Sequence, residues 1–188
     1  RALAEVIGCC THRCTGSEAF AGLGPCTYDM DQDLGTHYFE RFMNFLRYVQ
    51  DNDLSCTVTV TDVKGLRTVP PHQQPNRDSY VHVDEIREDG IIISGFKCNQ
   101  TGILFAHEVV IVPTTNMKPE DKDFALACAI PADAPGMTFI LGRTPQDKRF
   151  FEVEGDIEGI DLGKPYADHQ AMVYFDKVFV PNERVFLC

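Results

Sequence analysis

The sequence has few basic residues, no long hydrophobic run and no internal repeat. Its 188 residues include 17 Lys and Arg against 28 Asp and Glu, which gives a formal net charge of −11 at pH 7. Nucleic-acid binding requires clustered Lys and Arg, so this composition excludes a nucleic-acid footprint. Nothing approaches a run of about 18 apolar residues, which excludes a membrane-spanning helix at the level of sequence.

The apolar content suffices for one sizeable core. Hydrophobic residues make up 44% of the chain, enough at this length for one core and part of a second. The chain begins at Arg1 without a signal-peptide pattern and stops at Cys188 directly after an apolar stretch. We therefore expect a piece of a longer polypeptide, located in the cytoplasm.

Eight cysteines are the unusual feature of the composition. Disulfide frameworks belong to short secreted chains without a core, so free thiols are expected here. Cys56, Cys98 and Cys128 each lie in an apolar, strand-like run, which is typical of buried thiols. Half of the cysteines instead lie near the start of the chain: Cys9, Cys10, Cys14 and Cys26.

The first part of the chain has the periodicity of helices. Apolar residues recur at spacings of three and four from Tyr38 to Val49, which places them on one helix face. Thr36 is the expected start of this helix. An earlier helix is expected to begin near Thr15 or Ser17, and Gly22, Gly24 and Pro25 are expected to interrupt it, which leaves its extent undefined.

After Asp53 the period changes to two, which predicts strands. The β-rich runs, separated by Pro-containing gaps, are 57–61, 80–86, 90–96, 107–112, 124–130, 137–141 and 171–180. Asp89-Gly90 predicts a hairpin because both residues tolerate positive φ. Many short strands favour an antiparallel barrel or sandwich. The sequence thus predicts an α+β chain, with helices over 1–53 and a β domain over 54–188.

Two cysteines near the start of the chain have a spacing that suits a metal. Cys10 and Cys14 are four residues apart, so on a helix their thiols face the same way, with Cβ atoms about 5–6 Å apart. Two such thiolates can hold a metal, or one edge of an iron–sulfur cluster, if other ligands come from elsewhere. Incidental thiols are the alternative interpretation.

The segment TDVKGLR follows a predicted strand at residues 61–67. Gly65 permits close approach of a ligand to the backbone, and Lys64 and Arg67 supply positive charge in an acidic chain. A strand-end loop of this kind can hold a phosphate or an anionic flavin ring. An ordinary solvated turn is the alternative.

A second polar segment, Asn99, Gln100 and Thr101, follows the run 90–96. Its amide and hydroxyl groups suit the polar edge of a flavin. A simple turn between strands would use the same residue types. Gln170, in the polar group before the last β-rich run, carries no specific signal by itself.

These segments, in this order, resemble a flavoprotein family that contains the 4-hydroxyphenylacetate 3-hydroxylases and the 4-hydroxybutyryl-CoA dehydratases and is similar in architecture to acyl-CoA dehydrogenases. The resemblance runs essentially from end to end. It is carried by CCTHRCTG, YVQDNDL, TDVKGLR, REDGIIISGFK, NQTG, AHEVVIVPT, EDKDFALACAIPAD and FDKVFVPNERVFLC. It implies that 1–53 is the end of an N-terminal helical domain, that 54–188 is a β-barrel-like middle domain, and that a C-terminal helical domain is absent from this chain.

The paired cysteines select the dehydratases, because the hydroxylases bind flavin without an iron–sulfur cluster. The resemblance implies that Cys10 and Cys14 are two ligands of a [4Fe-4S] cluster, with a His and a Cys beyond Cys188 as the others. It also implies a substrate-site role for Thr101 and for Gln170. The FAD contacts that it implies are Val60, Thr61, Asp62, Val63, Lys64, Gly65, Leu66, Arg67, Asn99, Gln100 and Thr101.

The activity that the resemblance implies is that of a lyase. It is the FAD- and [4Fe-4S]-dependent dehydration of a hydroxyacyl-CoA, such as 4-hydroxybutyryl-CoA to crotonyl-CoA, together with isomerisation of vinylacetyl-CoA. The resemblance also implies a radical mechanism and a homotetramer. The alternatives are an aromatic hydroxylase that uses reduced FAD and oxygen, and a non-catalytic chain. Three positions depart from the family pattern: Leu66 replaces an acid, Asn99 a His and Gln170 a Glu. The Gln170 amide cannot act as a base. We expect the three changes to affect the choice of substrate more than folding or flavin binding.

Overall fold

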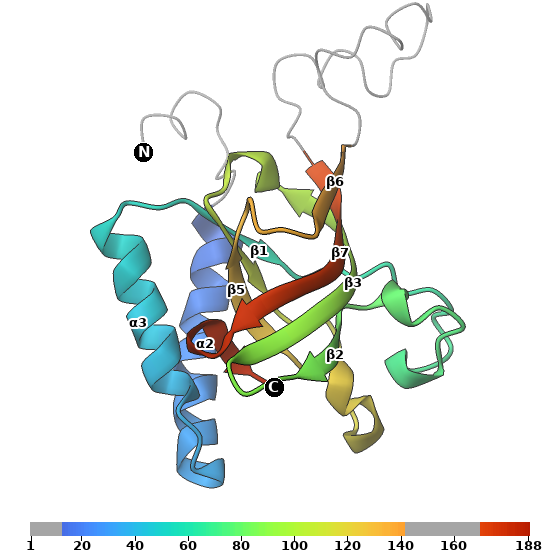
Figure 1. The fold of residues 1–188 in the computed structure, drawn as a ribbon, viewed down its shortest axis with the longest axis horizontal. Coiled ribbons are helices and arrows are strands. Elements are labelled where there is room, and N and C mark those ends of the chain that lie inside the picture. Colours follow the sequence, from blue (N-terminus) through green and yellow to red (C-terminus); the bar gives the residue numbers. More distant parts are fainter. Residues whose placement is uncertain (1–12, 142–169) are drawn as a thin grey trace, which may run out of the picture.

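The computed structural model describes residues 13–141 and 170–188, with side chains from residue 17 onward. The helices are α2 (Arg13–Leu34) and α3 (Tyr38–Asp51). The strands are β1 (Cys56–Thr59), β2 (His82–Ile86), β3 (Gly90–Thr101), β4 (Glu108–Ile111), β5 (Ala127–Pro131), β6 (Met137–Leu141), β7 (Gln170–Pro181) and β8 (Val185–Leu187). Figure 1 shows the two helices on one side of the strands.

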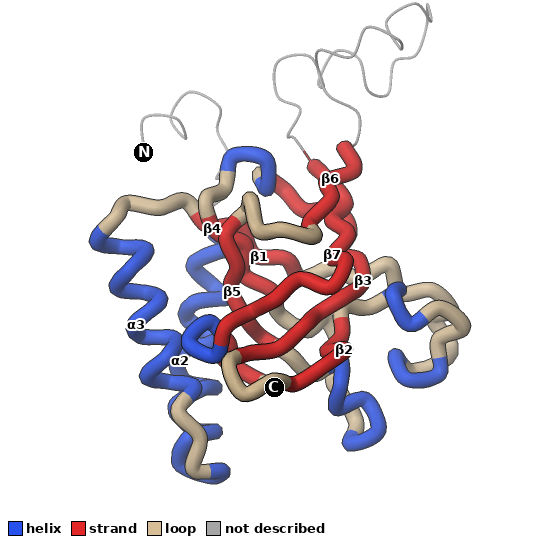
Figure 2. The backbone as a smooth tube through the Cα atoms, viewed as in Figure 1, coloured by secondary structure: helices blue, strands red, loops and turns tan. Residues whose placement is uncertain are grey.

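The strands form two sheets that pack face to face, and the helices cover the outer face of one sheet (Figure 2). The covered sheet has the order β1-β4-β5-β8, and the other has the order β2-β3-β7-β6. Strand alternation explains the three layers: Val109 and Ile111 of β4 enter the core between the sheets, whereas Val110 faces the helices. Because β4 is buried on both faces, its sequence is a continuous apolar run at 109–112 and does not alternate between apolar and polar residues.

Aromatic rings join α3 to the covered sheet. Phe42 and Phe45 lie 5.6 and 5.4 Å, between ring centroids, from Phe186 of β8. They belong to one buried cluster with Ala127 and Ala129 of β5, and the small alanine side chains leave room for the rings above the sheet. The helical part of the chain and the β part therefore share a core.

Helix α2 continues through the residues that were expected to interrupt it. Gly24 and Pro25 lie inside the helix, although Pro25 lacks the N–H of one helical hydrogen bond. Phe20 packs against Phe42 and Phe45 at 6.0 and 6.3 Å between ring centroids. Tertiary packing of this kind overrides local propensity.

The expected start of the second helix at Thr36 is wrong in its detail. The residue before the first turn of α3 is His37, which makes no side-chain capping bond. Instead, the carboxylate of Asp31 accepts hydrogen bonds from Tyr38 N at 2.8 Å and Phe39 N at 3.0 Å, and from the Thr36 hydroxyl at 2.6 Å. A carboxylate from the preceding helix thus satisfies the free N–H groups of α3.

The expected antiparallel β structure is found, with two differences. The hairpin at Asp89-Gly90 joins β2 and β3 as an antiparallel pair, but β1 and β4 pair in parallel. A parallel pair needs a long crossover, which the chain supplies by passing through β2 and β3 of the other sheet. In the described part of the chain the two sheets remain separate, so no closed barrel forms there.

None of the described helices has the length and apolar character needed to cross a membrane. The described cysteines are free thiols: Cys26, Cys56, Cys98, Cys128 and Cys188. Cys128 is buried in β5, and burial raises the pKa of its thiol. Burial, together with the charge of Glu108, raises the pKa of Cys56 to about 11, which keeps this half-buried thiol protonated at neutral pH.

Candidate functional site

The two polar segments singled out from the sequence lie side by side. Residues 60–67 form a loop that leaves β1, and Asn99, Gln100 and Thr101 are the last residues of β3. Cys98 N donates to Thr61 O at 2.7 Å, and an antiparallel bridge pairs Asp62 with Lys97. The folded chain therefore brings both predicted flavin contacts to one place, where β1 and β3 end.

A bulge at the end of β3 separates the roles of Asn99 and Gln100. The register between β3 and β7 shifts between Lys97 and Gln100, and Asn99 is exposed with a φ of 53°, a left-handed conformation that Asn tolerates. Gln100 is buried and its amide donates to Thr61 O at 3.3 Å. Asn99 is thus exposed to solvent, whereas Gln100 holds the loop.

Thr101 and Gln170, the two predicted substrate residues, are direct partners across β3 and β7. Thr101 is half-buried and Gln170 is exposed. The hydroxyl of Thr57 on β1 donates to Thr101 O at 3.1 Å, which fixes this end of β3 against the other sheet. The two polar side chains therefore stand together at the strand ends.

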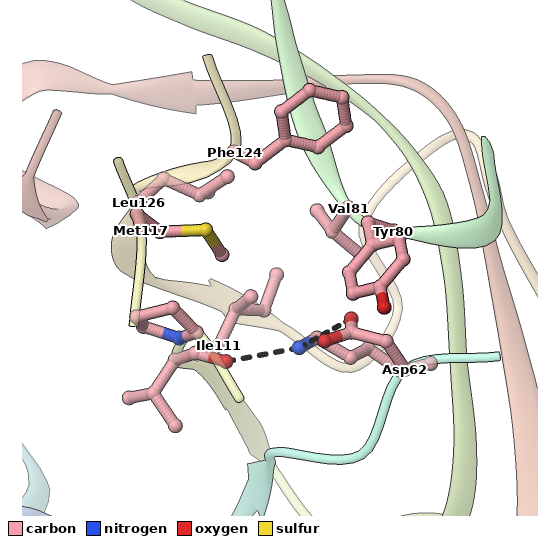
Figure 3. A pocket seen from close by; sticks show the side chains of 10 residues that line it. Asp62, Tyr80, Val81, Ile111, Met117, Phe124 and Leu126 are labelled. Atoms are coloured by element: carbon pink, nitrogen blue, oxygen red, sulfur yellow. Dashed lines mark hydrogen bonds and ion pairs between the residues drawn. The ribbon is translucent and has the colours of Figure 1, made fainter. Parts of the chain in front are cut away.

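The start of the loop is held by a buried charge network (Figure 3). Lys97 Nζ lies 2.7 Å from Asp62 Oδ1 and donates to Val60 O at 2.8 Å and to Val112 O at 2.9 Å. The hydroxyl of Thr114 contacts both Val60 O and the carboxylate of Asp62. Burial lowers the pKa of the Lys97 ammonium, and the neighbouring Asp62 carboxylate opposes this shift.

The far end of the loop is held by one buried amide. Gln74 accepts from Leu66 N at 2.9 Å and donates to Leu66 O at 2.8 Å and Val69 O at 3.0 Å. Gly65 has a φ of 42°, and a Cβ there would lie 2.3 Å from Gln74 Oε1. Glycine is therefore required at this position by both the backbone conformation and the close approach of Gln74.

Between these two attachments the loop is open and positively charged. Val63, Gly65, Leu66 and Arg67 are exposed, and Lys64 is half-buried. Neither Lys64 nor Arg67 forms an ion pair with a residue in the described ranges. No carboxylate of the described part of the chain therefore neutralises either cation.

The predicted cluster ligands lie largely outside what the structure describes. Cys10 is outside the described residues, and Cys14 is described only as backbone in the first turn of α2. Among the described side chains, no group of three His, Cys, Asp or Glu residues could hold a metal ion. The pairing of Cys10 and Cys14 on a cluster remains a prediction.

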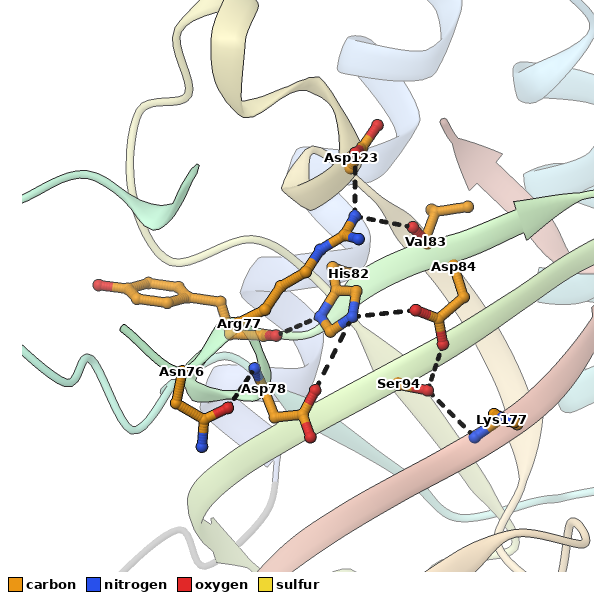
Figure 4. Close-up of polar contacts among 10 residues, drawn as sticks. Asn76, Arg77, Asp78, His82, Val83, Asp84, Ser94, Asp123 and Lys177 are labelled. Atoms are coloured by element: carbon orange, nitrogen blue, oxygen red, sulfur yellow. Dashed lines mark hydrogen bonds and ion pairs between the residues drawn. The ribbon is translucent and has the colours of Figure 1, made fainter. Parts of the chain in front are cut away.

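A second polar cluster surrounds His82 (Figure 4). His82 Nε2 lies 3.1 Å from Asp84 Oδ1, and Nδ1 donates to Tyr80 O at 3.0 Å. The Ser94 hydroxyl donates to Asp84, and it accepts from Lys177 N at 3.2 Å. A Ser–His dyad needs the imidazole beside the hydroxyl. Because the carboxylate separates them here, the cluster is better suited to tying β2, β3 and β7 together.

Sequence reasoning missed the residues that support the loop, namely Lys97, Gln74 and Thr114. A signal existed for Lys97, because a lysine inside the apolar run GIIISGFKC is almost never buried unless it is paired. Gln74 lies in a Pro-rich segment without periodicity, and nothing in its sequence context distinguishes it from a solvated loop residue.

Comparison with known sequences identifies the relatives of this chain. The profile described as "4-hydroxyphenylacetate 3-hydroxylase N terminal" matches residues 1–187. A 4-hydroxybutyryl-CoA dehydratase/vinylacetyl-CoA-Δ-isomerase of Clostridium aminobutyricum is 42% identical over 189 residues, which cover 100% of this chain and 38% of that protein. The oxygenase component of 4-hydroxyphenylacetate 3-monooxygenase from Thermus thermophilus is 32% identical over 168 residues, covering 85% of this chain and 32% of that protein.

Solved structures that resemble this chain include the same two groups of proteins, the dehydratases and the monooxygenase oxygenase components. An oxygen-tolerant archaeal 4-hydroxybutyryl-CoA dehydratase from N. maritimus superposes with a TM-score of 0.87 and 36% identity, covering 99% of this chain and 37% of that one. The oxygenase component of 4-hydroxyphenylacetate 3-monooxygenase in complex with FAD gives a TM-score of 0.67 and 27% identity, covering 89% and 34%. The chain thus spans less than two fifths of the length of these relatives.

Proposed function

The chain belongs to the 4-hydroxyphenylacetate 3-hydroxylase family, and from that premise we propose that it is the FAD-binding part of a dehydratase acting on a hydroxyacyl-CoA thioester. One observation carries the choice of reaction: the likeness to a 4-hydroxybutyryl-CoA dehydratase covers the whole chain at 42% identity, against 32% over 85% of it for a monooxygenase. We assign residues 1–53 to the end of a helical domain and residues 54–188 to the flavin-binding β domain.

The geometry at the ends of β1 and β3 fits FAD. Lys64 and Arg67 are cations without an ion-pair partner among the described residues, and they can bind its phosphates. Gly65 lets the ligand approach the backbone, and the exposed amide of Asn99 can pair with the polar edge of the flavin ring. FAD supplies one-electron redox chemistry to such a site.

Thr101 and Gln170 are proposed to orient the substrate. Dehydration of a 4-hydroxyacyl-CoA removes a proton β to the thioester carbonyl, where no enolate stabilises the negative charge. A side-chain base alone is therefore insufficient. The Gln170 amide cannot take up a proton, so its part is to hydrogen-bond the substrate beside the Thr101 hydroxyl, its partner across the strands.

Cys10 and Cys14 are proposed to bind a [4Fe-4S] cluster together with ligands from a C-terminal domain. Thiolates are the common protein ligands of such clusters. By likeness to the dehydratases, we further propose a homotetramer. A reducing compartment such as the cytoplasm suits the five free thiols of the described residues.

The cofactor content of the protein tests this proposal. Protein expressed from its complete coding sequence and purified without oxygen is expected to contain FAD, iron and acid-labile sulfide. In a Lys64→Ala/Arg67→Ala variant, FAD binding should weaken by about a hundredfold or more, because each of the two lost charged hydrogen bonds contributes about 1.5–3 kcal/mol, while iron stays unchanged. Flavin absorbance after gel filtration and colorimetric iron and sulfide assays give these values.

The second candidate function is a flavin-dependent aromatic hydroxylase. It is favoured by the FAD-bound oxygenase component, which shares the fold of this chain with a TM-score of 0.67. The same measurement separates the two functions. FAD without iron or sulfide would contradict the dehydratase and support the hydroxylase.

A further inference from the structure

Lys97 is a lysine whose charge is enclosed in the protein interior. It lies on β3, and only 1% of the residue is exposed to solvent. Its ammonium meets three oxygens: a carboxylate oxygen of Asp62 at 2.7 Å, and the carbonyls of Val60 at 2.8 Å and Val112 at 2.9 Å. An ammonium has three N–H donors, so each hydrogen has one acceptor.

The three acceptors lie where two strands of the opposite sheet end. Val60 and Asp62 follow β1, and Val112 follows β4, the parallel partner of β1. Val112 N also donates to Thr59 O at 3.2 Å. Lys97 therefore connects β3 in one sheet to the ends of two strands in the other, at the point where the chain turns into the loop 60–67.

Thr114 completes the enclosure of the Asp62 carboxylate. One oxygen of Asp62 faces Lys97 and the other faces the Thr114 hydroxyl, which also contacts Val60 O. The surrounding side chains are apolar or aromatic and leave a cavity of only about 10 Å³, roughly the space of one water molecule. They are Tyr80, Val81, Ile111, Met117, Phe124 and Leu126, which Figure 3 shows lining the same cavity as Asp62.

Such a network is a costly way to fill a core. Removing two charges from water is unfavourable, and hydrophobic residues of similar volume often stabilise a protein equally well. Directional hydrogen bonds, however, fix the geometry of their partners in a way that apolar contacts do not. Here the fixed partners are Val60 and Asp62, directly before Val63, Lys64 and Gly65 in the open part of the loop.

We propose that Lys97, together with Asp62 and Thr114, is a positioning residue that sets the direction of the loop 60–67 and thereby the affinity of this site for FAD. This inference rests on the proposed function of the loop. Lys97 does not touch the flavin itself, because its three hydrogens are already used within the network. It acts through Val60 and Asp62 on Lys64 and Gly65, and Gln74 holds the other end at Leu66.

Two sets of variants separate positioning from a general effect on folding. In Lys97→Met/Asp62→Leu both charges are replaced by apolar side chains of similar size, so no unpaired charge remains buried. Thr114→Val removes only a hydroxyl and keeps the shape of the side chain, and Thr114→Ser keeps the hydroxyl as its matched control. All variants are made in the protein expressed from its complete coding sequence and are compared at a temperature where circular dichroism shows each to be folded.

The measurement is the Kd of the flavin-free protein for FAD, from quenching of flavin fluorescence, together with the visible spectrum of the bound flavin. We expect Kd to rise at least tenfold in Lys97→Met/Asp62→Leu and severalfold in Thr114→Val, with a shifted flavin band, and to stay at the native value in Thr114→Ser. If the double variant does not fold, the Thr114 pair decides alone. Native Kd and spectrum in all folded variants would overturn the inference and leave the proposed function intact. Failure of the unmodified protein to bind FAD would overturn both.

Discussion

Replacing Arg184 with Met is expected to lower the free energy of unfolding by about 3–5 kcal/mol. The Arg184 guanidinium binds both carboxylate oxygens of Glu108, at 2.6 and 3.3 Å, and the Glu108 side chain is only 3% exposed. The guanidinium also lies 5.4 Å from the centroid of the Tyr48 ring on α3. Its loss would leave a buried carboxylate without a partner and would remove a contact between the helices and the sheet.

A surface ion pair provides the matched control. Arg87 and Glu85 are 2.9 Å apart, and their side chains are 47% and 55% exposed, so Arg87→Met should change the free energy of unfolding by at most about 1 kcal/mol. Adding Glu108→Leu to Arg184→Met should recover part of the loss, because the unpaired charge is then removed. Urea unfolding followed by circular dichroism measures all three. Equal effects of Arg184→Met and Arg87→Met would show that the buried pair does not stabilise the fold.

Replacing Cys10 and Cys14 together with Ala is expected to remove iron, acid-labile sulfide and dehydratase activity while FAD stays bound. The expectation follows from the proposed roles: thiolates are cluster ligands, and the FAD site is built from the loop 60–67 and the end of β3. Cys26→Ala is the control, because Cys26 is an exposed thiol on the same helix α2. Iron content, flavin absorbance and substrate turnover are measured on the same preparations.

Retention of iron and sulfide in the Cys10→Ala/Cys14→Ala variant would mean that other residues hold the cluster. Loss of FAD along with iron would mean that the two cofactor sites are not independent. The first result would contradict the assignment of these two cysteines, whereas the second would contradict only the expectation that FAD binds independently of the cluster.

Local patterns in the sequence predicted much of the fold. The apolar spacing from Tyr38 to Val49 gave the helix α3, and Asp89-Gly90 gave the hairpin between β2 and β3. These features depend on residues close together in the chain, where turn chemistry and periodicity determine the structure. The cap of α3 could not be predicted, because a side-chain contact from Asp31 decides it.

Contacts between distant segments were not predictable in the same way. Parallel pairing of β1 with β4 and the register shift near Asn99 depend on how the two sheets meet. The candidate site shows the same division. The exposed residues Lys64, Gly65 and Asn99 were identified from their chemistry, whereas the supporting Lys97 and Gln74 are defined only by the oxygens and amides that the fold brings to them. The roles of the individual site residues stay predictions until variants of these residues are measured.

The most direct test of the proposed function is an assay of the anaerobically purified native protein with 4-hydroxybutyryl-CoA, with the products separated by liquid chromatography. The proposal predicts conversion to crotonyl-CoA without added reductant or oxygen. Absence of any dehydrated CoA ester from a preparation that contains FAD, iron and sulfide, together with hydroxylation of 4-hydroxyphenylacetate when reduced FAD and oxygen are supplied, would contradict it.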